Sequence, residues 1–343
     1  MQRRISITLM IVAAAATAWL LLLVLVSVSA LPSPAIPPDL ARVELGATLF
    51  VEPALSGNGA QSCASCHQAA RAFTDGRETA VGSTGEAHSL NTPSVVNAGE
   101  LSALGWARPD LTSLEAQIAV PLFGTHPVEM GAVGHEAEIL GRLKADACYP
   151  ALFRAAFPDD TEPLRWPRVI DALAAYVRSL RSSGSYDRFL AGEEAALSEE
   201  ARRGAALFVE IGCSVCHSGP LLTNSSYHNL GLYGFTGLAD VPPGQEGLYR
   251  ITGKARDLGR WRVPSLRNVA LTAPYFHDGS ETTLEAVLDV YEQGGRGEGR
   301  DSPLKSEAIV PITLSREDRA ALIAFLTALT DDSPASLVSQ VTP

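Results

Sequence analysis

The stretch Gly204-Ala205-Ala206-Leu207-Phe208-Val209-Glu210, followed by Cys213-Ser214-Val215-Cys216-His217, decides the fold of this chain. An earlier stretch, Gly46-Ala47-Thr48-Leu49-Phe50-Val51-Glu52, resembles its first part and precedes a second Cys-x-x-Cys-His sequence at Cys63–His67. This spacing is the attachment signature of c-type haem. A redox cysteine pair or half of a zinc site would not explain the histidine after both pairs. The sequence therefore predicts two covalent haems, bound through Cys63, Cys66, Cys213 and Cys216, with His67 and His217 as iron ligands.

A third pair of segments extends the repeat. Ala172-Leu173-Ala174-Ala175-Tyr176-Val177 is echoed by Ala321-Leu322-Ile323-Ala324-Phe325-Leu326. The three pairs are offset by 158, 150 and 149 residues, so their order and spacing are preserved. The chain therefore contains a duplicated unit.

Both ends of the unit carry helical patterns. Apolar residues between Val169 and Leu180, and again between Leu322 and Leu329, fall on one helix face. Ser198 and Ser315 are good N-caps, the latter with Asp318 three residues on. No stretch shows sustained strand-type alternation. We predict a mostly α fold with two tandem cytochrome c-like domains and long loops. The predicted divisions are a signal peptide or N-terminal anchor (1–30), a Pro-rich spacer (31–39), domain 1 (40–182), a linker (183–194), domain 2 (195–332) and a tail (333–343).

The first 30 residues indicate export. Arg3 and Arg4 precede an apolar stretch from Ile5 to Val28, and Val28-Ser29-Ala30 is a candidate cleavage site. The stretch is longer than most signal cores and close to the length of a membrane span, so a cleaved signal and an uncleaved tether both remain open. Either would place the rest of the chain in the periplasm, which suits c-type haem.

Charge excludes one class of partner. The chain has 27 basic and 38 acidic side chains, and two of the arginines lie in the first 30 residues, which leaves 25 basic against 38 acidic. Nucleic acid is therefore not an expected partner. An acidic surface suits a basic protein donor or serves only solvation. The unpaired Cys148 is expected to be a buried, inert thiol.

Few residues are available as second ligands of the irons. The only methionines are Met1, Met10 and Met130, so the second haem cannot take a methionine from its own domain. Five histidines remain besides His67 and His217, namely His88, His126, His135, His228 and His277. Each is more often a surface or hydrogen-bonding residue than a ligand. Tyrosine is also a known haem ligand.

Further motifs are similar to those of the bacterial di-haem cytochrome c peroxidase and MauG family over nearly the whole mature chain. They include Phe73–Arg77, Asn91–Asn97, Pro127–Gly131, Val263–Gly279 and Thr283-Leu284-Glu285. The segments Gly82–His88 and Pro121–Pro127 resemble most the MbnH-like branch. Members of that branch oxidise tryptophan in a partner protein, MbnP, which is linked to copper handling.

The resemblance assigns roles in domain 1. Glu129 matches the distal acid that moves a proton between peroxide oxygens. Gln117 and Pro121 match the other distal positions, and Trp106 matches the tryptophan between the two haems. Glu129 lies two residues farther from Gln117 than the usual family spacing, so the loop between them differs from the family pattern.

The resemblance also assigns ligands. Asn91, Thr272 and Pro274 match an inter-domain calcium site, and oxygen ligands suit calcium. Tyr291, eight residues after Thr283, matches the position that holds methionine in the classical peroxidases and tyrosine in MauG. The distal histidine that blocks the first haem in many resting peroxidases has no counterpart in register, since His88 lies out of step. The first haem is therefore expected to be five-coordinate and ready for peroxide.

Three functional hypotheses follow. The first is an enzyme that uses hydrogen peroxide to oxidise a side chain of a partner protein. The second is a peroxidase that takes electrons from a small c-type cytochrome. The third is a di-haem electron carrier without catalysis. Tyr291 favours the first over the second, and Glu129 disfavours the third.

Overall fold

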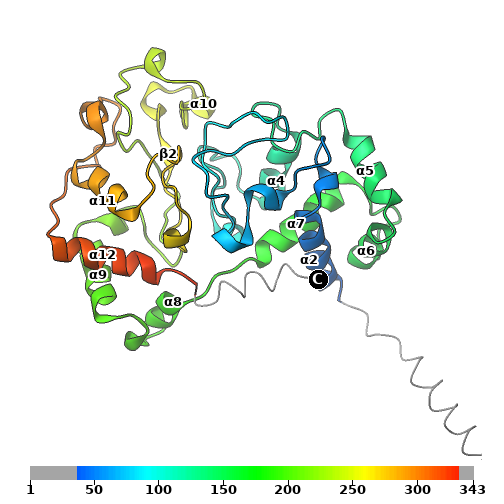
Figure 1. Cartoon of the computed structure of the whole chain (residues 1–343), viewed down its shortest axis with the longest axis horizontal. Helices are drawn as coiled ribbons and strands as arrows, with labels where there is room; N and C mark the ends of the chain where they lie inside the picture. Colours follow the sequence, from blue (N-terminus) through cyan, green and yellow to red (C-terminus); the bar gives the residue numbers. More distant parts are fainter. Residues whose placement is uncertain (1–36, 332–343) are drawn as a thin grey trace, which may run out of the picture. The chain divides into compact units, whose positions relative to one another are not determined.

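Helices make up most of the regular structure in residues 37–331, the residues that the computed structural model describes (Figure 1). The predicted leader, most of the spacer and the tail lie outside these residues. The helices are α2 (Pro38–Phe50), α3 (Cys63–Cys66), α4 (Leu114–Phe123), α5 (Glu136–Ala145), α6 (Tyr149–Ala156), α7 (Trp166–Ser179), α8 (Ser185–Leu190), α9 (Glu199–Glu210), α10 (Tyr249–Thr252), α11 (Leu284–Glu292) and α12 (Arg316–Ala328). The prediction of a mostly α fold is confirmed. Within the described residues, no helix combines the length and apolar character that crossing a membrane requires.

One two-stranded sheet is present in residues 37–331, and it joins loops of the second half. The strands β1 (Tyr227–His228) and β2 (Trp261–Arg262) pair antiparallel, with Tyr227 opposite Arg262 and His228 opposite Trp261. Each strand is only two residues long, so it carries no alternation that a sequence pattern could reveal.

The two copies of the repeat pack their end helices in the same way. In the first copy, α2 lies against α7, and a Cβ atom added to Gly46 would stand 2.0 Å from the carbonyl oxygen of Ala172. In the second copy, α9 lies against α12, and a Cβ on Gly204 would stand 1.9 Å from the carbonyl oxygen of Ala321. Only glycine permits this backbone approach, which explains why each copy of the repeat begins with it.

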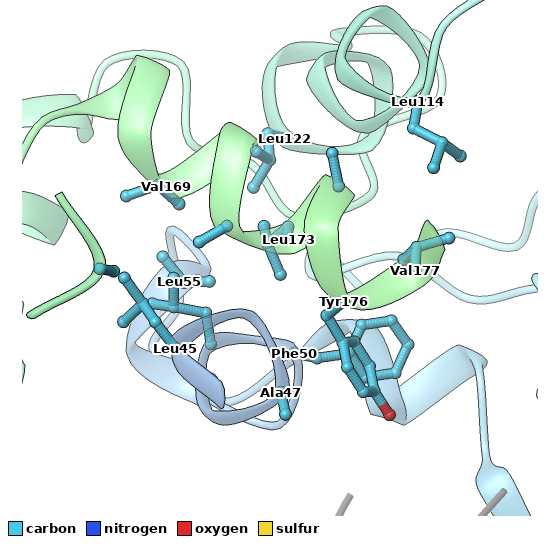
Figure 2. Packing of buried hydrophobic residues seen from close by; sticks show 14 of the residues in the cluster. Leu45, Ala47, Phe50, Leu55, Leu114, Leu122, Val169, Leu173, Tyr176 and Val177 are labelled. Carbon is cyan, nitrogen blue, oxygen red and sulfur yellow. The ribbon is translucent and has the colours of Figure 1, made fainter. Parts of the chain in front are cut away.

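Apolar side chains form two separate clusters. The buried members of the first lie between residues 41 and 180, and those of the second lie between residues 208 and 329. Figure 2 shows the first cluster, where Leu45 and Phe50 of α2 face Leu173 and Tyr176 of α7. Tyr176 and Leu45 are fully buried, and each buried leucine of this kind stabilises the fold by about 2 kcal/mol. The boundaries of the two predicted domains stay a prediction.

A second feature common to both halves follows each haem motif: a serine hydroxyl that donates to a backbone carbonyl. The Ser94 hydroxyl donates to the carbonyl of Ala72 at 2.7 Å, and the Ser265 hydroxyl donates to the carbonyl of Leu221 at 2.7 Å. Three residues after each serine, Asn97 and Asn268 adopt positive φ values of 59° and 61°. Asparagine tolerates this conformation better than most residues. The duplication therefore includes the loops as well as the helices.

The predicted helix caps are present. The Ser198 side chain accepts a hydrogen bond from the amide of Ala201 at 3.1 Å. Ser315 and Asp318 form a reciprocal capping box at the start of α12. Such caps satisfy amide groups that the first helical turn leaves without partners. Both N-cap predictions are confirmed.

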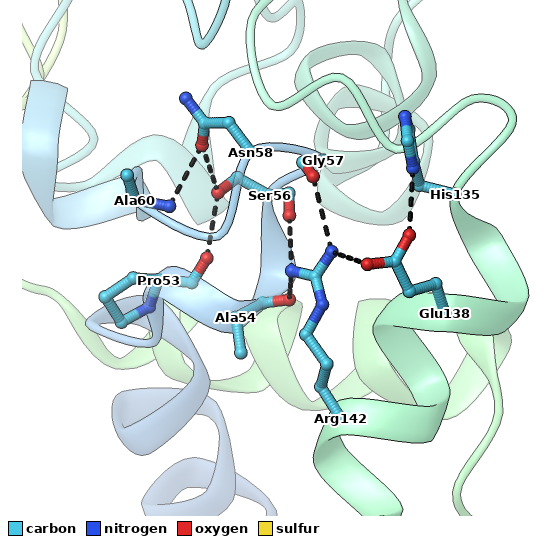
Figure 3. Close-up of polar contacts among 9 residues, drawn as sticks. All are labelled: Pro53, Ala54, Ser56, Gly57, Asn58, Ala60, His135, Glu138 and Arg142. Carbon is cyan, nitrogen blue, oxygen red and sulfur yellow. Dashed lines mark hydrogen bonds and ion pairs between the residues drawn. The ribbon is translucent and has the colours of Figure 1, made fainter.

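The loop before the first haem motif is held by one arginine (Figure 3). Arg142 of α5 donates to the carbonyl oxygens of Ala54 and Ser56 at 3.1 and 2.9 Å and pairs with Glu138 at 3.0 Å. Several backbone carbonyls thus share one guanidinium fork. The second copy has no such insertion before its cysteines, so this anchor belongs to the first half.

The prediction for Cys148 is wrong. The side chain is exposed, because Cys148 stands just before α6, where the next residue, Tyr149, turns into the core with 4% of its surface exposed. The Cys148 amide donates to the Asp146 carboxylate at 2.7 Å. The segment between α5 and α6 therefore presents the thiol to solvent.

We expect Gly204→Ala to lower the thermal unfolding midpoint of the haem-loaded protein. The added methyl group would force α9 and α12 apart, and overpacking of this kind costs about 1–3 kcal/mol. Differential scanning calorimetry would measure the change.

Gly141→Ala is the matched control. Gly141 lies in α5, and a Cβ there meets nothing within 4 Å, so alanine should stabilise the helix by about 1 kcal/mol. An unchanged midpoint for Gly204→Ala would contradict the proposed close contact.

Candidate functional site

The first haem motif opens into a cavity of about 480 Å³. Cys63, Cys66 and His67 line it, on α3 and at the C-terminal end of that helix. The volume lies within the range of small-molecule and cofactor pockets. Both thiols and the imidazole therefore face one space.

A backbone carbonyl orients the histidine in this cavity. His67 Nδ1 lies 3.0 Å from the carbonyl oxygen of Phe73. The turn that brings this carbonyl into place has positive φ values at Ala72 (48°) and Phe73 (61°), a conformation that costs energy in residues with side chains. Burial lowers the pKa of His67, although its hydrogen bond to Phe73 opposes the effect. The imidazole is therefore neutral, with Nδ1 engaged and Nε2 free to bind a metal.

Three other predicted residues line the same cavity. Gln117 and Pro121 lie on α4, and Glu129 follows on the loop after this helix. The Gln117 Oε1 atom is buried and has no hydrogen-bond partner within the described residues. A buried polar atom of this kind is costly unless a ligand or water pairs with it.

Glu129 is a buried acid. Burial raises its pKa to about 7, well above the ordinary value for a glutamate. Its backbone is fixed, since the Glu129 carbonyl accepts from the amide of Ser83 at 2.8 Å and the next amide, of Met130, donates to the carbonyl of Pro121 at 2.9 Å. The carboxyl group can therefore take up and release a proton near neutral pH.

The second haem motif opens into a cavity of about 520 Å³. Cys213, Cys216 and His217 line it, and His217 Nδ1 lies 3.1 Å from the carbonyl oxygen of Leu222, whose φ is 52°. Burial lowers the pKa of His217 to about 4. The contact between the histidine Nδ1 and a backbone carbonyl is thus present in both cavities.

Tyr291 of α11 lines this second cavity together with His217. Burial raises the pKa of Tyr291, and nearby cysteine thiols act in the same direction. Met130, the one methionine among residues 37–331, lines the first cavity instead and is buried there. Tyr291 and His217 thus border the same cavity.

Eight residues border both cavities, and they include Asn91, Trp106, Trp261 and Arg262. The Trp106 indole donates to the carbonyl of Asn91 at 2.8 Å, and the amide of Arg262 donates to the backbone carbonyl of Trp106 at 2.8 Å. We call Asn91, Trp106, Trp261 and Arg262 the junction. The first bond orients the indole of Trp106, and the second holds its backbone.

Arg262 brings a buried positive charge to the junction. Its guanidinium donates to the carbonyl oxygens of Gly105 and Val263 at 2.7 and 3.3 Å, and no carboxylate pairs with it within the described residues. Burial lowers the pKa of Arg262. A buried cation without an anion is unfavourable, so a ligand with carboxylate groups would complete this site.

Four of the five remaining histidines also line the cavities. His88 and His126 border the first, and His228 and His277 border the second. The Nε2 atom of His88 is buried without a hydrogen-bond partner in the described part of the chain. Although His88 is out of register with the blocking histidine of other peroxidases, it therefore reaches the same cavity. His135 instead pairs with Glu138 at 3.1 Å, away from both cavities.

The predicted calcium ligands share one cavity. Asn91, Thr272 and Pro274 all line the second cavity. The Asn91 side-chain amide donates to the carbonyls of Arg77 and Glu78 at 2.9 and 3.3 Å. Residues 37–331 contain no cluster of three or more His, Cys, Asp or Glu suited to a metal ion, so a cation here would depend on amide and backbone oxygens. The calcium site stays a prediction.

Sequence reasoning missed two members of the junction. Trp261 reads as an ordinary buried aromatic, and Arg262 has no signal of its own. Their one clue is position, because both immediately precede the Val263–Gly279 motif that resembles the peroxidase family.

The residues fit two c-type haems. Each cavity has the two thiols, a neutral histidine and a volume suited to a cofactor, and the buried Arg262 suits haem carboxylates. The lining of the first cavity also includes an acid, an amide and a proline, whereas that of the second includes a tyrosine.

Comparison with known proteins agrees with this geometry. A family model described as di-haem cytochrome c peroxidase matches residues 40–195. Cytochrome-c peroxidase IdrP1 of Denitromonas iodatirespirans is 35% identical over 337 residues, covering 89% of this chain and 85% of that protein. Methylamine utilization protein MauG of Methylorubrum extorquens is 36% identical over 303 residues, covering 88% of this chain and 81% of that protein.

A solved structure is similar over a comparable length. The crystal structure of a MauG-like protein associated with microbial copper homeostasis is 42% identical and superimposes with a TM-score of 0.83, covering 91% of this chain and 96% of that one. Identity that extends over both halves, together with the shared fold, shows that this chain belongs to the di-haem cytochrome c peroxidase and MauG family of oxidoreductases.

Proposed function

We propose that this protein uses hydrogen peroxide to oxidise a side chain, most specifically tryptophan, of a periplasmic partner protein. The observation that carries the proposal is Tyr291, which lines the second cavity where the classical peroxidases use methionine. An anionic oxygen ligand favours the higher oxidation states of iron and lowers the reduction potential. Such a site is suited to sharing oxidising equivalents rather than to accepting electrons from a small cytochrome.

The two haems would supply the redox chemistry that peroxide reduction requires. In the first cavity, the Glu129 carboxylate accepts a proton from one peroxide oxygen and returns it to the oxygen that leaves, which assists O–O cleavage. Gln117 orients the peroxide by hydrogen bonding through its unpartnered Oε1. Pro121 shapes the pocket and excludes water.

Trp106 is the relay between the two cavities in this proposal. Trp106 borders both cavities, its indole N–H donates to the carbonyl of Asn91, and its backbone carbonyl accepts from the amide of Arg262. We include a calcium ion at Asn91, Thr272 and Pro274, where it would fix the junction. Removal of calcium by a chelator would then loosen the position of Trp106.

The partner is proposed from similarity. The MauG-like protein that is 42% identical to this chain is associated with microbial copper homeostasis. A small exported protein similar to MbnP and linked to copper is therefore the proposed substrate. A gene for such a protein beside this one would support the assignment.

A second candidate is peroxide removal with electrons from a small c-type cytochrome. Relatives named cytochrome-c peroxidase and the acidic charge of the chain favour it. Adding peroxide to the purified ferric protein, with reduced cytochrome c or with the candidate partner, separates the two. Oxygen gained by the partner in mass spectrometry supports the first proposal, while rapid cytochrome oxidation without it supports the second. If the haem spectra do not respond to peroxide, both fail.

We expect the rate of reaction with peroxide to rise as the pH increases through about 7, where Glu129 loses its proton. The carboxylate is the form that accepts a proton, and the protonated acid below this pH cannot. Glu129→Gln should remove this pH dependence and slow the reaction by about 10²–10⁴-fold. Stopped-flow absorbance at several pH values measures both effects.

Glu86→Gln is the control, because Glu86 is an exposed acid on the neighbouring loop. It should leave the rate and its pH profile unchanged. A Glu129→Gln enzyme that keeps the wild-type profile would exclude Glu129 as the proton acceptor.

Tyr291→Phe should change the absorption and electron paramagnetic resonance (EPR) spectra of the second haem, because phenylalanine offers no oxygen to the iron. Tyr275→Phe is the matched control: Tyr275 lines the same cavity, but its hydroxyl donates to the carbonyl of Val269 at 3.2 Å. Identical spectra for Tyr291→Phe and the wild type would remove Tyr291 as a ligand.

A further inference from the structure

A second tyrosine of the second cavity is paired with a buried acid. Tyr233 lines this cavity and is half-buried, and its hydroxyl donates a hydrogen bond to the Asp278 carboxylate. Asp278 has 6% of its surface exposed. The same carboxylate accepts from the amide of Ser280 at 3.1 Å and lies 3.7 Å from the guanidinium of Arg296.

The two groups have complementary protonation states. Burial acts to raise the pKa of Asp278, but the electrostatic effect of His277 and hydrogen bonds from Tyr233 and Ser280 outweigh it, and the pKa is lowered. Burial and the hydrogen bond to Asp278 raise the pKa of Tyr233. At neutral pH a neutral phenol therefore faces an ionised carboxylate, which is ready to accept its proton.

An aromatic path connects this pair to the junction. The Trp261 ring, which borders both cavities, stacks on the His277 ring with centroids 4.0 Å apart and planes at 16°. The centroid of the His277 ring lies 6.3 Å from that of Tyr233 in a T-shaped arrangement. Contacts between π systems at this separation are direct, so an electron can move between Tyr233 and the junction in short steps.

The tyrosines of the described residues differ in this respect. Tyr149 also donates to a carboxylate, that of Glu52 at 2.7 Å, but it lines neither cavity. Tyr275 lines the second cavity but bonds to a backbone carbonyl. Among residues 37–331, Tyr233 is the tyrosine that combines a place in a cavity wall with a carboxylate acceptor.

We infer that Tyr233 is a redox-active relay, with Asp278 as its proton acceptor, through which oxidising equivalents leave the second cavity toward a reductant at the surface. This inference deepens the proposed function and rests on it. It assigns to Tyr233 a role separate from that of Tyr291, the proposed ligand of the second haem.

The step balances within the pair. One electron leaves the phenol of Tyr233 for the oxidising equivalent that peroxide provides. The phenolic O–H bond breaks, the proton forms a new O–H bond on Asp278, and a neutral tyrosyl radical remains. An electron from the side chain of the partner protein that is oxidised in the proposed function, together with the proton returned by Asp278, restores the tyrosine. The nearby charge of Arg296 stabilises the carboxylate whenever the proton is absent.

Peroxide alone is the probe in the test. The holoprotein is mixed with hydrogen peroxide, frozen within milliseconds and examined by EPR spectroscopy, with parallel absorption spectra of the haems. We expect a tyrosyl radical whose hyperfine pattern collapses when the protein contains ring-deuterated tyrosine. Tyr233→Phe should lose this signal while its ferric haem spectra stay unchanged. Asp278→Asn, which keeps an acceptor oxygen but does not take up the proton, should lose it as well.

Tyr149→Phe is the matched control, because it removes a tyrosine–carboxylate pair of the same chemistry outside the cavities, and it should keep the radical. If peroxide leaves the haem spectra unchanged, the proposed function fails and takes the inference with it. If the haems respond but the radical is absent, or survives Tyr233→Phe, the inference alone is wrong. Tyr233→Phe removes only a hydroxyl group. Its result therefore shows whether Tyr233 carries the radical, even where Asp278→Asn does not fold.

Discussion

The close contact between the first and last helix of each repeat is the constraint on which the rest of the structure depends. At Gly46 and Gly204 the backbones approach until no side-chain atom fits between them. This contact holds α2 and α9 in place, and the phenylalanine near the end of each helix then packs on the proximal histidine. The ring centroids of Phe50 and His67, and of Phe208 and His217, are both 6.4 Å apart. A packing contact far from the chemistry thus sets the position of each iron ligand.

The two cavities share these proximal parts and differ opposite them. In the first, the buried Glu129 titrates near neutral pH, which suits a group that must both accept and return a proton. In the second, Tyr291 and Tyr233 supply phenols in two different settings, one in the cavity wall with His217 and one bonded to Asp278. Between them the junction supplies indole rings and one buried positive charge. In the proposed function, proton transfer and charge storage therefore belong to different halves of one chain.

The sequence predicts the features that have local signals. Serine caps, helical periodicity and the repeated glycine all depend on residues close in the chain, and the structure has them. The carbonyl of Leu222 that orients His217 depends instead on a strained turn of a non-glycine residue, for which no local pattern exists. Trp261 joins the junction through a strand of two residues, too short to produce a pattern. Cys148 is exposed because its neighbour Tyr149 takes the core position. Composition does not reveal which of the two residues is buried.

The hydrogen bond from the histidine of each haem motif to a carbonyl is alike in the two copies of the unit, whereas other groups that line the cavities differ. Gln117 and Glu129 come from α4 and its following loop, while Tyr291 comes from α11. After the duplication, the hydrogen bonds to the histidines stayed alike while these other groups diverged. Evolution could therefore change what one iron does without disturbing how either is held, and a single ancestral unit could give rise to two specialised halves.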